Sequence, residues 1–269
     1  MTLASVWENA WYGKARWVYL FAPLAWLFRA LARRRRSRLK SRAVAFDVPV
    51  VVVGNISVGG TGKTPLLIAL VQRLRKAGYC PGVVSRGYGG KAPRYPLMVS
   101  ADTPVTHCGD EPLAIARATQ CAVCVSPDRV EAAQALREQG CDIVLSDDGL
   151  QHYRLARDLE IAVVDGARAF GNGWCLPVGP LREPIERLNE VDWVVVNGSE
   201  DKVREQTPTL RTVQHTMKVT PDAWHRVSDG TRASLTHFAP QTSVHAVAGI
   251  GNPDRFFSTL KELGLEPVH

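Results

Sequence analysis

The chain has no hydrophobic segment long enough to cross a membrane. Its apolar run from Trp17 to Phe28 ends at Arg29, whereas spanning a bilayer takes ~20 apolar residues. Acidic residues are nearly absent from residues 1–42, where Glu8 stands alone against ten Lys and Arg. The rest of the chain has 23 basic and 25 acidic residues, so the formal net charge of +7 comes from the first 42 residues. The positive charge is therefore a local feature of the N-terminal region.

Disulfide and zinc frameworks are also lacking. The six cysteines of this 269-residue chain follow no secretory spacing, which predicts reduced thiols. Cys121 and Cys124 form a C-x-x-C, but no second Cys or His pair stands at zinc spacing, and residues 121–125 are typical of a buried strand. With 45% hydrophobic and 22% charged residues, the chain has the composition of a folded protein of one large or two moderate domains.

The N-terminal region is rich in aromatic residues and leucine. Six apolar residues recur there at about helical spacing, and a dense arginine cluster follows them: Trp7, Trp11, Val18, Phe21, Ala25 and Phe28. This pattern predicts an amphipathic helix that lies on an anionic membrane surface. A signal peptide is disfavoured because the basic block follows the apolar segment. A helix packed on its own domain, with the arginines as a solvated face, remains an alternative.

From Asp47 onward, strand and helix patterns alternate, which predicts an α/β fold with a mostly parallel sheet covered on both faces. The expected strands are residues 50–53, 82–85, 122–125, 142–146, 159–164, 192–196, 212–219 and 244–250. The expected helices are residues 64–76, 111–118, 128–138 and 254–263. We expect three parts: a membrane-associating segment (1–42), a P-loop core (43–198) and a smaller C-terminal portion (199–269). The last strand and helix look like the opening of a further unit, so we expect the chain to stop short of the whole protein.

A phosphate-binding loop follows the first expected strand. Four valines, Val50 to Val53, lead into a glycine-rich turn that ends in Gly-Lys-Thr. Backbone N–H groups of such a turn and the following helix N-terminus bind phosphate. Ser57 stands where the first glycine of the G-x-x-x-x-G-K-[ST] pattern belongs, so we expect the loop to turn at Gly59 and Gly60. The expected nucleotide-binding residues are Ser57, Val58, Gly59, Gly60, Thr61, Gly62, Lys63 and Thr64.

Two pairs of acids are candidates for chemistry. Asp147 and Asp148 end a buried strand, where carboxylates of open α/β sheets can hold the Mg²⁺ of a nucleotide; either could be the metal carboxylate, or both could cap the loop. Asp110 and Glu111 precede a helical stretch and could simply complement its dipole. Charged loops with Arg86, and with Arg182 and Glu183, are of the kind that shapes a substrate site.

These motifs together resemble one enzyme family. The runs 54–65, 85–89, 109–112, 147–152, 180–184 and 249–253 are similar, in content and order, to those of the tetraacyldisaccharide 4′-kinases, the lipid A 4′-kinases. The resemblance covers nearly the whole chain, and Ser57 belongs to the family's own form of the loop. It implies a P-loop kinase fold with a membrane-associating N-terminal helix.

The resemblance also implies an activity and residue roles. The family transfers the ATP γ-phosphate to the 4′-hydroxyl of a tetraacylated glucosamine disaccharide 1-phosphate at the cytoplasmic face of the inner membrane. Lys63 would then stabilise the transferring phosphate, and Asp110 would be the general base. Mg²⁺ would be held among Thr64, Asp147, Asp148 and Glu111, and the substrate or site geometry by Arg86, His152, Arg182 and Glu183. The base's partner in an Asp-His motif would lie beyond residue 269.

Two other functions fit the same loop. A P-loop enzyme acting on a soluble metabolite would use Lys63, Thr64 and Asp147, with the N-terminal helix as a packing element. A nucleotide-gated binding protein would dispense with Asp110. Nucleic-acid binding is disfavoured because no basic surface interleaved with aromatic residues continues into the body of the chain. We expect a monomer whose partners are the lipid A precursor and an anionic membrane surface.

Overall fold

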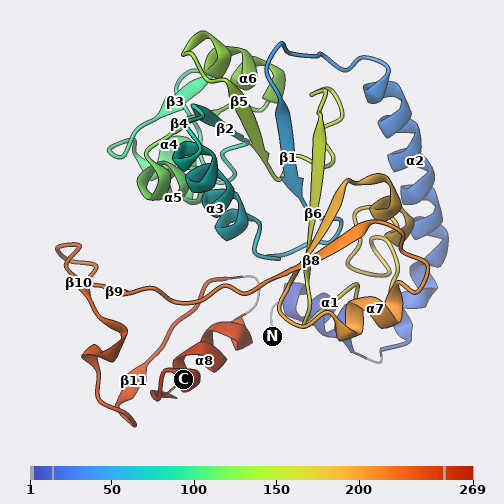
Figure 1. The fold of residues 1–269 in the computed structure, drawn as a ribbon. Helices are drawn as coiled ribbons and strands as arrows, with labels where there is room; N and C mark the ends of the chain where they lie inside the picture. The colour runs from blue at the N-terminus through green and yellow to red at the C-terminus, as the bar shows by residue number, and fades with distance from the viewer. Residues whose placement is uncertain (1–2, 14, 251–252, 269) are drawn as a thin grey trace. The chain divides into compact units, whose positions relative to one another are not determined.

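Alternating strands and helices form one eight-stranded sheet with helices on both faces (Figure 1). The computed structural model describes residues 3–13, 15–250 and 253–268. The strand order is β3-β4-β2-β5-β1-β6-β7-β8, and every neighbouring pair is parallel except the edge pair β3–β4. The strands are β1 (Val50–Gly54), β2 (Pro81–Ser85), β3 (Leu97–Val99), β4 (Ala122–Val125), β5 (Ile143–Asp147), β6 (Leu159–Asp165), β7 (Trp193–Asn197) and β8 (Val213–Met217).

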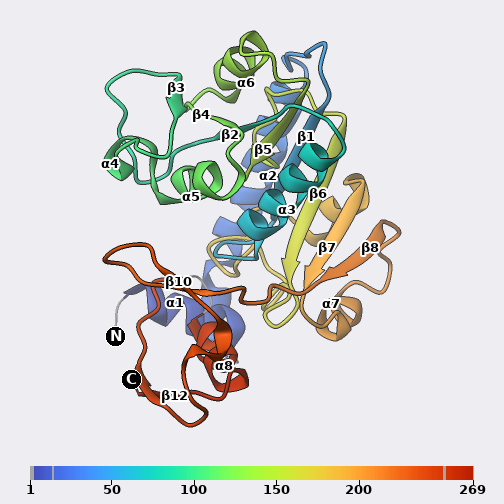
Figure 2. The same ribbon diagram turned by 60° about the vertical axis from the view of Figure 1, so that its left-hand side comes forward.

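Helices cover the two faces of this sheet and pack on two separate hydrophobic clusters. One cluster joins the sheet to α6 and α7, with Phe28 of α2 packed against it; the other joins the opposite face to α3 and α5 (Figure 2). The helices are α1 (Leu3–Tyr12), α2 (Ala22–Lys40), α3 (Lys63–Lys76), α4 (Val105–Cys108), α5 (Asp110–Thr119), α6 (Arg129–Glu138) and α7 (Asp201–Gln206), with 3₁₀ turns η1 (Trp17–Phe21) and η2 (Ile185–Glu190). The predicted doubly covered parallel sheet is confirmed.

The chain divides into two compact units. The larger comprises Met1–Val58 and Gly62–Met217, and the smaller comprises Gly59–Thr61 and Lys218–His269. The smaller unit contains β9 (Trp224–His225), β10 (Arg232–Ala233), η3 (Leu235–His237), β11 (Ser243–His245), α8 (Pro253–Glu262) and β12 (Glu266–Val268). Strand β8 belongs to the large sheet, beyond residue 198. The three functional parts expected from the sequence stay a prediction.

Most expected elements occur within two residues of their predicted limits, and the exceptions have physical reasons. The strand expected over 244–250 spans only Ser243–His245, because among the described residues only these three pair with β12. Strand β3 was not expected, since three residues at a sheet edge are too few to show alternation. Gly251 and Asn252, part of the resemblance, lie outside the described residues.

The N-terminal region differs from the single helix expected. It forms α1, η1 and α2, with the chain turning between α1 and η1. Small residues of all three segments are buried against Val178, and Trp11 Nε1 donates a hydrogen bond to the carbonyl of Pro177 (2.9 Å). The packed-helix alternative is thus correct for the inner side of this region. Among the described residues, none of the helices has the length and apolarity that crossing a bilayer requires.

The outer side of the same region is strongly apolar. Leu20 is 82% exposed and Trp26 is 60% exposed, and Trp17, Tyr19, Leu24, Leu27 and Leu31 are also exposed. The N-terminal region is therefore both packed and amphipathic: part of it is covered by the domain, and η1 and α2 also expose several large apolar side chains. Burying each such side chain would be worth about 1.5–3 kcal/mol.

A buried ion pair connects β6 with η2. Arg187 Nη2 donates to both carboxylate oxygens of Glu160, at 2.7 and 2.6 Å, and Arg157 Nη1 donates to Glu160 at 2.8 Å. Although burial raises the pKa of Glu160, the two arginines lower it further, so its folded pKa lies below the ordinary value. A carboxylate with a depressed folded pKa stabilises the fold above its unfolded pKa and loses that contribution as pH falls through the folded value.

We therefore expect Glu160→Gln to lower the free energy of unfolding by about 3–5 kcal/mol at pH 7, because it removes the carboxylate that is hydrogen-bonded to the buried Arg187 and leaves only the longer ion pair with Glu183. The cost should shrink as the pH falls below the ordinary pKa of glutamate, where Glu160 of the unfolded chain takes up a proton, and should be lost as the pH falls through the lower folded pKa. Denaturant unfolding at pH 7 and pH 4 measures both values. Glu205→Gln, on exposed α7, is the control, and an equal effect of the two substitutions would contradict this account.

Candidate active site

The loop between β1 and α3 turns through two glycines in the left-handed region. Gly59 has a φ of 94° and Gly62 a φ of 95°. A Cβ atom on Gly62 would also lie 2.4 Å from the side-chain nitrogen of Asn197 at the end of β7. We expected the loop to turn at Gly60 as its second glycine, but it turns at Gly62. The reason is that the side chain of Asn197 lies close to the backbone at Gly62, just before α3 begins. Helix α3 then begins at Lys63, with Thr64 in its first turn.

The segment after Gly179 supports this loop. Val58 N–H donates to the carbonyl of Pro180 at 2.8 Å, and Arg182 N–H donates to the carbonyl of Ile56 at 2.7 Å. Ser57 and Leu181 form an isolated antiparallel bridge between the two segments. Two segments far apart in the sequence, 56–58 and 180–182, are therefore joined by backbone hydrogen bonds. These bonds fix the position of Arg182 beside the loop.

Strands β1 and β5 bring the loop and an acidic pair to the same end of the sheet, where the strands have their carboxyl ends; this end is called the sheet edge below. They run parallel with Val53 opposite Asp147, so both carboxyl ends meet where ligands of open α/β sheets bind. Lys63 Nζ lies 3.6 Å from Asp148 Oδ1, and Arg182 Nη1 donates to Asp148 Oδ2 at 3.1 Å. Burial raises the pKa of Asp148, but these two cations outweigh it and leave the pKa below its ordinary value. Asp148 is therefore ionised.

Asp147 occupies a different environment. It is 2% exposed, and Ser85 Oγ donates to its Oδ2 at 3.5 Å. Burial raises the pKa of Asp147 to about 7, and the negative charges of Glu111 and Asp148 add to this rise. Its Oδ1 is buried and has no hydrogen-bond partner in the described structure. A cation that approaches this unpartnered oxygen would stabilise the ionised form of the Asp147 carboxylate.

Asp110 and Glu111 open α5, directly after Gly109. Desolvation raises the pKa of Glu111; Lys63 opposes this shift, and Asp110 and Asp148 add to it. Both side chains are exposed at the rim. Asp110 is thus an exposed carboxylate in the first turn of α5.

The remaining expected residues divide into two groups. Arg86 follows β2 and is exposed. Burial, with the neighbouring cations Arg129 and Arg157, lowers the pKa of His152 to about 4, so its imidazole is neutral at physiological pH. Glu183 is buried and accepts hydrogen bonds from Tyr153 and Gln151 instead of facing the sheet edge. Its place favours site geometry over direct contact with a substrate.

Sequence reasoning missed three residues of this edge. Arg129, 2% exposed, donates to the carbonyl of Asp147 at 3.2 Å, and burial lowers its pKa to about 10 against the pull of Asp147 and Asp148. Ser85 contacts Asp147, and Asn197 contacts Gly62. Ser85 and Asn197 each end a strand of the parallel sheet, and that position was the available signal.

The donor set fits a hard cation bound with a nucleotide. Asp147 Oδ1 and Asp148 Oδ1 are buried carboxylate oxygens without hydrogen-bond partners in the described structure. Mg²⁺ takes oxygen ligands and is usually bound through one or two carboxylates plus substrate phosphates. The Thr64 hydroxyl, in the first turn of α3, matches the further ligand of a P-loop site.

A strand, a glycine-rich loop and a helix that begins at Lys-Thr, beside a strand that ends in Asp-Asp, define a P-loop nucleotide-binding protein. The family model described as LpxK, tetraacyldisaccharide-1-P 4′-kinase, matches residues 17–269. The chain belongs to this family, and the resemblance drawn from its motifs is confirmed.

Individual relatives agree with this assignment. The tetraacyldisaccharide 4′-kinase of Aeromonas salmonicida is 49% identical over 96% of this chain and 76% of its own length. That of Azotobacter vinelandii is 48% identical over 100% of this chain and 79% of its own. The crystal structure of LpxK from Aquifex aeolicus in complex with ATP is 26% identical, with a TM-score of 0.74, over 94% of this chain and 80% of that one.

Proposed function

We propose that this protein is an ATP-dependent kinase of lipid A biosynthesis, which phosphorylates the 4′-hydroxyl of a tetraacylated glucosamine disaccharide 1-phosphate. The observation that carries the proposal is the placement of Lys63 and Arg182 against Asp148 at the P-loop edge of the sheet, in a chain of this family. ATP is the phosphate donor, in agreement with the relative that was solved in complex with ATP.

Lys63 and Arg182 stabilise the charge on the transferring phosphate. Both are held near the loop by Asp148, so little reorganisation is needed when the triphosphate binds and Lys63 exchanges its carboxylate for phosphate oxygens. The backbone of residues 57–64 holds the phosphates. Thr64 and Asp147 or Asp148, with Glu111, would hold Mg²⁺, which when bound would neutralise charge on the phosphates.

Asp110 accepts the proton of the sugar hydroxyl. Its carboxylate is exposed and lies on the helix that also carries Glu111, whose pKa reflects an interaction with the charge of Lys63. The sugar oxygen attacks the γ-phosphorus, the bond to the bridging oxygen of ADP breaks, and the proton goes to Asp110. Arg86 and neutral His152 border the acceptor side.

A basic cavity beside α2 suits the anionic parts of the acceptor. Its volume is about 810 Å³, and its lining includes Gln151 and His152 of the Asp-Asp-Gly motif loop. Five arginines contribute to the same wall: Arg34, Arg35, Arg38, Arg42 and Arg154. Together with the exposed apolar side of α2, this wall fits a lipid whose head group carries phosphate and whose acyl chains stay in a bilayer. The site of action is the cytoplasmic face of the inner membrane, and the protein works as a monomer.

Transfer of ³²P from γ-labelled ATP to the purified disaccharide lipid, by the full-length protein, tests the proposed function. We expect a labelled product whose phosphate is on the 4′-oxygen. Labelling of a soluble sugar phosphate instead, or ATP binding without transfer to either acceptor, would favour one of the two alternative functions.

Membrane attachment is testable without deleting α2, whose inner side packs on the domain. We expect Leu20→Gln, Trp26→Gln and Leu27→Gln combined to reduce binding to vesicles of anionic phospholipid at least tenfold, because three exposed apolar anchors are lost. The melting temperature and ATP affinity should stay unchanged, since the three side chains are exposed. Vesicle flotation measures the binding.

The matched control replaces three exposed apolar residues elsewhere: Tyr79→Gln, Met98→Gln and Val105→Gln. It should bind vesicles like the unsubstituted protein, and high salt should weaken binding of both. Equal flotation of the two triple variants would place the membrane contact on another surface.

A further inference from the structure

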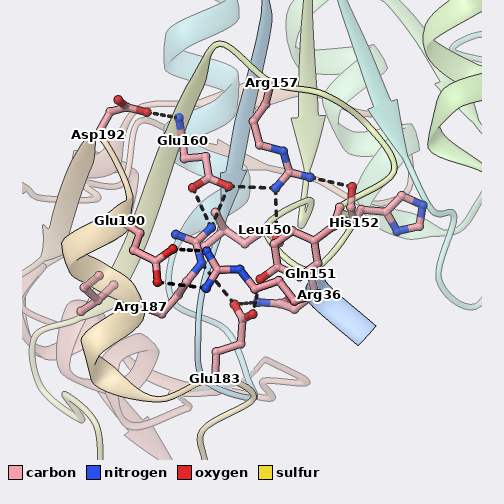
Figure 3. A network of polar contacts seen from close by, with 12 residues as sticks. Arg36, Leu150, Gln151, His152, Arg157, Glu160, Glu183, Arg187, Glu190 and Asp192 are labelled. Carbon is pink, nitrogen blue, oxygen red and sulfur yellow. Dashed lines mark hydrogen bonds and ion pairs between the residues drawn. The ribbon is translucent and has the colours of Figure 1, made fainter. Parts of the chain in front are cut away.

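A buried polar network lies between α2 and the sheet edge that carries Asp148. Figure 3 shows Glu183, Arg187, Glu160 and Arg157 joined in one chain of contacts. The network is deeply buried: Arg187 is 2% exposed and Glu160 6%. Charged groups are rarely buried so completely without a purpose in folding or function. The established site uses none of these four residues as a contact to substrate.

One end of the network is Arg36 of α2. Arg33, Arg34 and Arg35 are exposed, whereas Arg36 turns inward. It donates to both carboxylate oxygens of Glu190, the bond from Nη1 to Oε1 being 3.0 Å long. Arg36 is therefore half-buried and paired with η2, whereas its three neighbours in the arginine cluster are exposed.

Tyr153 is the next link. The guanidinium of Arg36 lies 5.3 Å from the centroid of the Tyr153 ring, and that of Arg157 lies 5.2 Å from it. This is the distance of a cation–π contact. The Tyr153 hydroxyl donates to Glu183; burial raises its pKa, and the Glu183 carboxylate raises it further, so the phenol keeps its proton.

Glu183 connects the ring to the catalytic edge. It also accepts from Gln151 Nε2 at 3.1 Å, and Gln151 Nε2 donates to the carbonyl of Asn55 in the loop after β1. Its chain neighbour Arg182 binds Asp148 and is fixed by its N–H bond to Ile56. Because Glu183 is anchored inward, the neighbouring side chain is directed toward Asp148.

Arg157 fixes the other side of the same edge. It donates to the backbone carbonyls of Leu150 (3.2 Å), His152 (2.6 Å) and Leu155 (3.0 Å). These residues lie in the segment that follows Asp147 and Asp148, so Arg157 holds the backbone that leads away from the acidic pair.

We propose that Arg36 and Tyr153 are positioning residues. They couple the position of α2 on the domain to the position of Arg182 against Asp148, and in this way they set the turnover rate. The proposal rests on the proposed kinase function. A kinase whose acceptor lies in a membrane gains from such a link, because the site is fully ordered only when α2 is correctly seated. The chemistry of the acceptor is unchanged by it; only the fraction of correctly placed Arg182 varies.

The test compares Arg36→Met, which keeps the aliphatic stem, with Arg137→Met, which removes an exposed ion pair with Asp47. Both are assayed over a range of ATP concentrations up to saturation, at saturating lipid in mixed micelles. We expect Arg36→Met to lower kcat about tenfold with KM for ATP unchanged, and Arg137→Met to leave both unchanged. Equal kcat values of the two variants would overturn the proposal.

A double substitution separates positioning from a general structural role. In an Arg182→Gln background, where the group to be positioned is gone, Arg36→Met should change kcat less than twofold. A further tenfold loss in that background would mean that Arg36 acts by another route, and the proposal would fail.

Tyr153→Phe covers the case in which Arg36→Met unfolds the protein. It keeps the ring and removes the hydroxyl bond to Glu183, so kcat should fall severalfold with little change in melting temperature. Unchanged kcat in Tyr153→Phe would also overturn the proposal. Absence of transfer to the lipid by the unsubstituted protein would instead contradict the proposed function, so the two failures are distinct.

Discussion

Replacing Lys63 by alanine should lower kcat at least a hundredfold. The substitution removes a cation aimed at the phosphate-binding loop, and one such preorganised group in a site sheltered from water typically contributes 10²–10³ in rate. It also leaves Asp148 with Arg182 as its nearest cation, since the Lys63 contact at 3.6 Å is lost. Single-turnover transfer from γ-labelled ATP measures the effect directly.

Lys76→Ala is the matched control, because Lys76 is the last residue of the same helix, at the end opposite the loop. It should keep full activity. The melting temperature of Lys63→Ala should change little, since Lys63 is only partly buried at the site edge. Full ATP-dependent activity in Lys63→Ala would remove the P-loop assignment altogether.

The sheet was predictable because its signals are local. Runs of valine such as Val50 to Val53 form strands at almost any central position of a parallel sheet, since both faces of such a sheet are buried. The position of Asp147 beside the loop followed from the rule that parallel strands present their carboxyl ends at one edge. Local composition and one topological rule therefore suffice to predict that Lys63, Thr64, Asp147 and Asp148 lie close together.

The bracing contacts were not predictable in the same way. Glu183 and Arg182 are neighbours of similar polarity, yet one is buried under Tyr153 and the other faces Asp148. That division depends on the pairing of residues 180–183 with residues 56–58, which is a long-range backbone contact. Arg187 carries no sequence sign of burial either, because arginine is normally exposed.

The packing of the N-terminal helix could not be predicted from the sequence either. Its helical spacing was visible, but spacing alone does not tell which side of α2 contacts the domain. Phe28 and Ala25 pack inward, whereas Leu24 and Leu27 are exposed, although all four are apolar. Tertiary packing decides between them, and the remaining apolar side is what makes a membrane surface a suitable neighbour.

Asp110→Asn separates a catalytic role from a structural one by the size of its effect. If Asp110 only complements the dipole of α5, the substitution costs a fraction of a kcal/mol in stability and leaves catalysis nearly unchanged. If Asp110 accepts the hydroxyl proton, asparagine keeps the shape but cannot take the proton, and such a group contributes 10²–10⁴ in rate. We expect a loss of kcat in that range, measured by steady-state transfer in the full-length protein.

Asp110 is exposed in the first turn of α5, where it contributes to the fold at most through the helix dipole. Nothing structural is therefore lost on substitution, and the melting temperature and ATP affinity should stay close to those of the unsubstituted protein. Asp102→Asn, at an exposed turn before α4, is the control for a lost surface carboxylate. A decrease of less than about tenfold in Asp110→Asn would return Asp110 to a dipole-complementing role. The proton acceptor would then be sought in Asp147, whose raised pKa of about 7 suits a base that works near neutral pH.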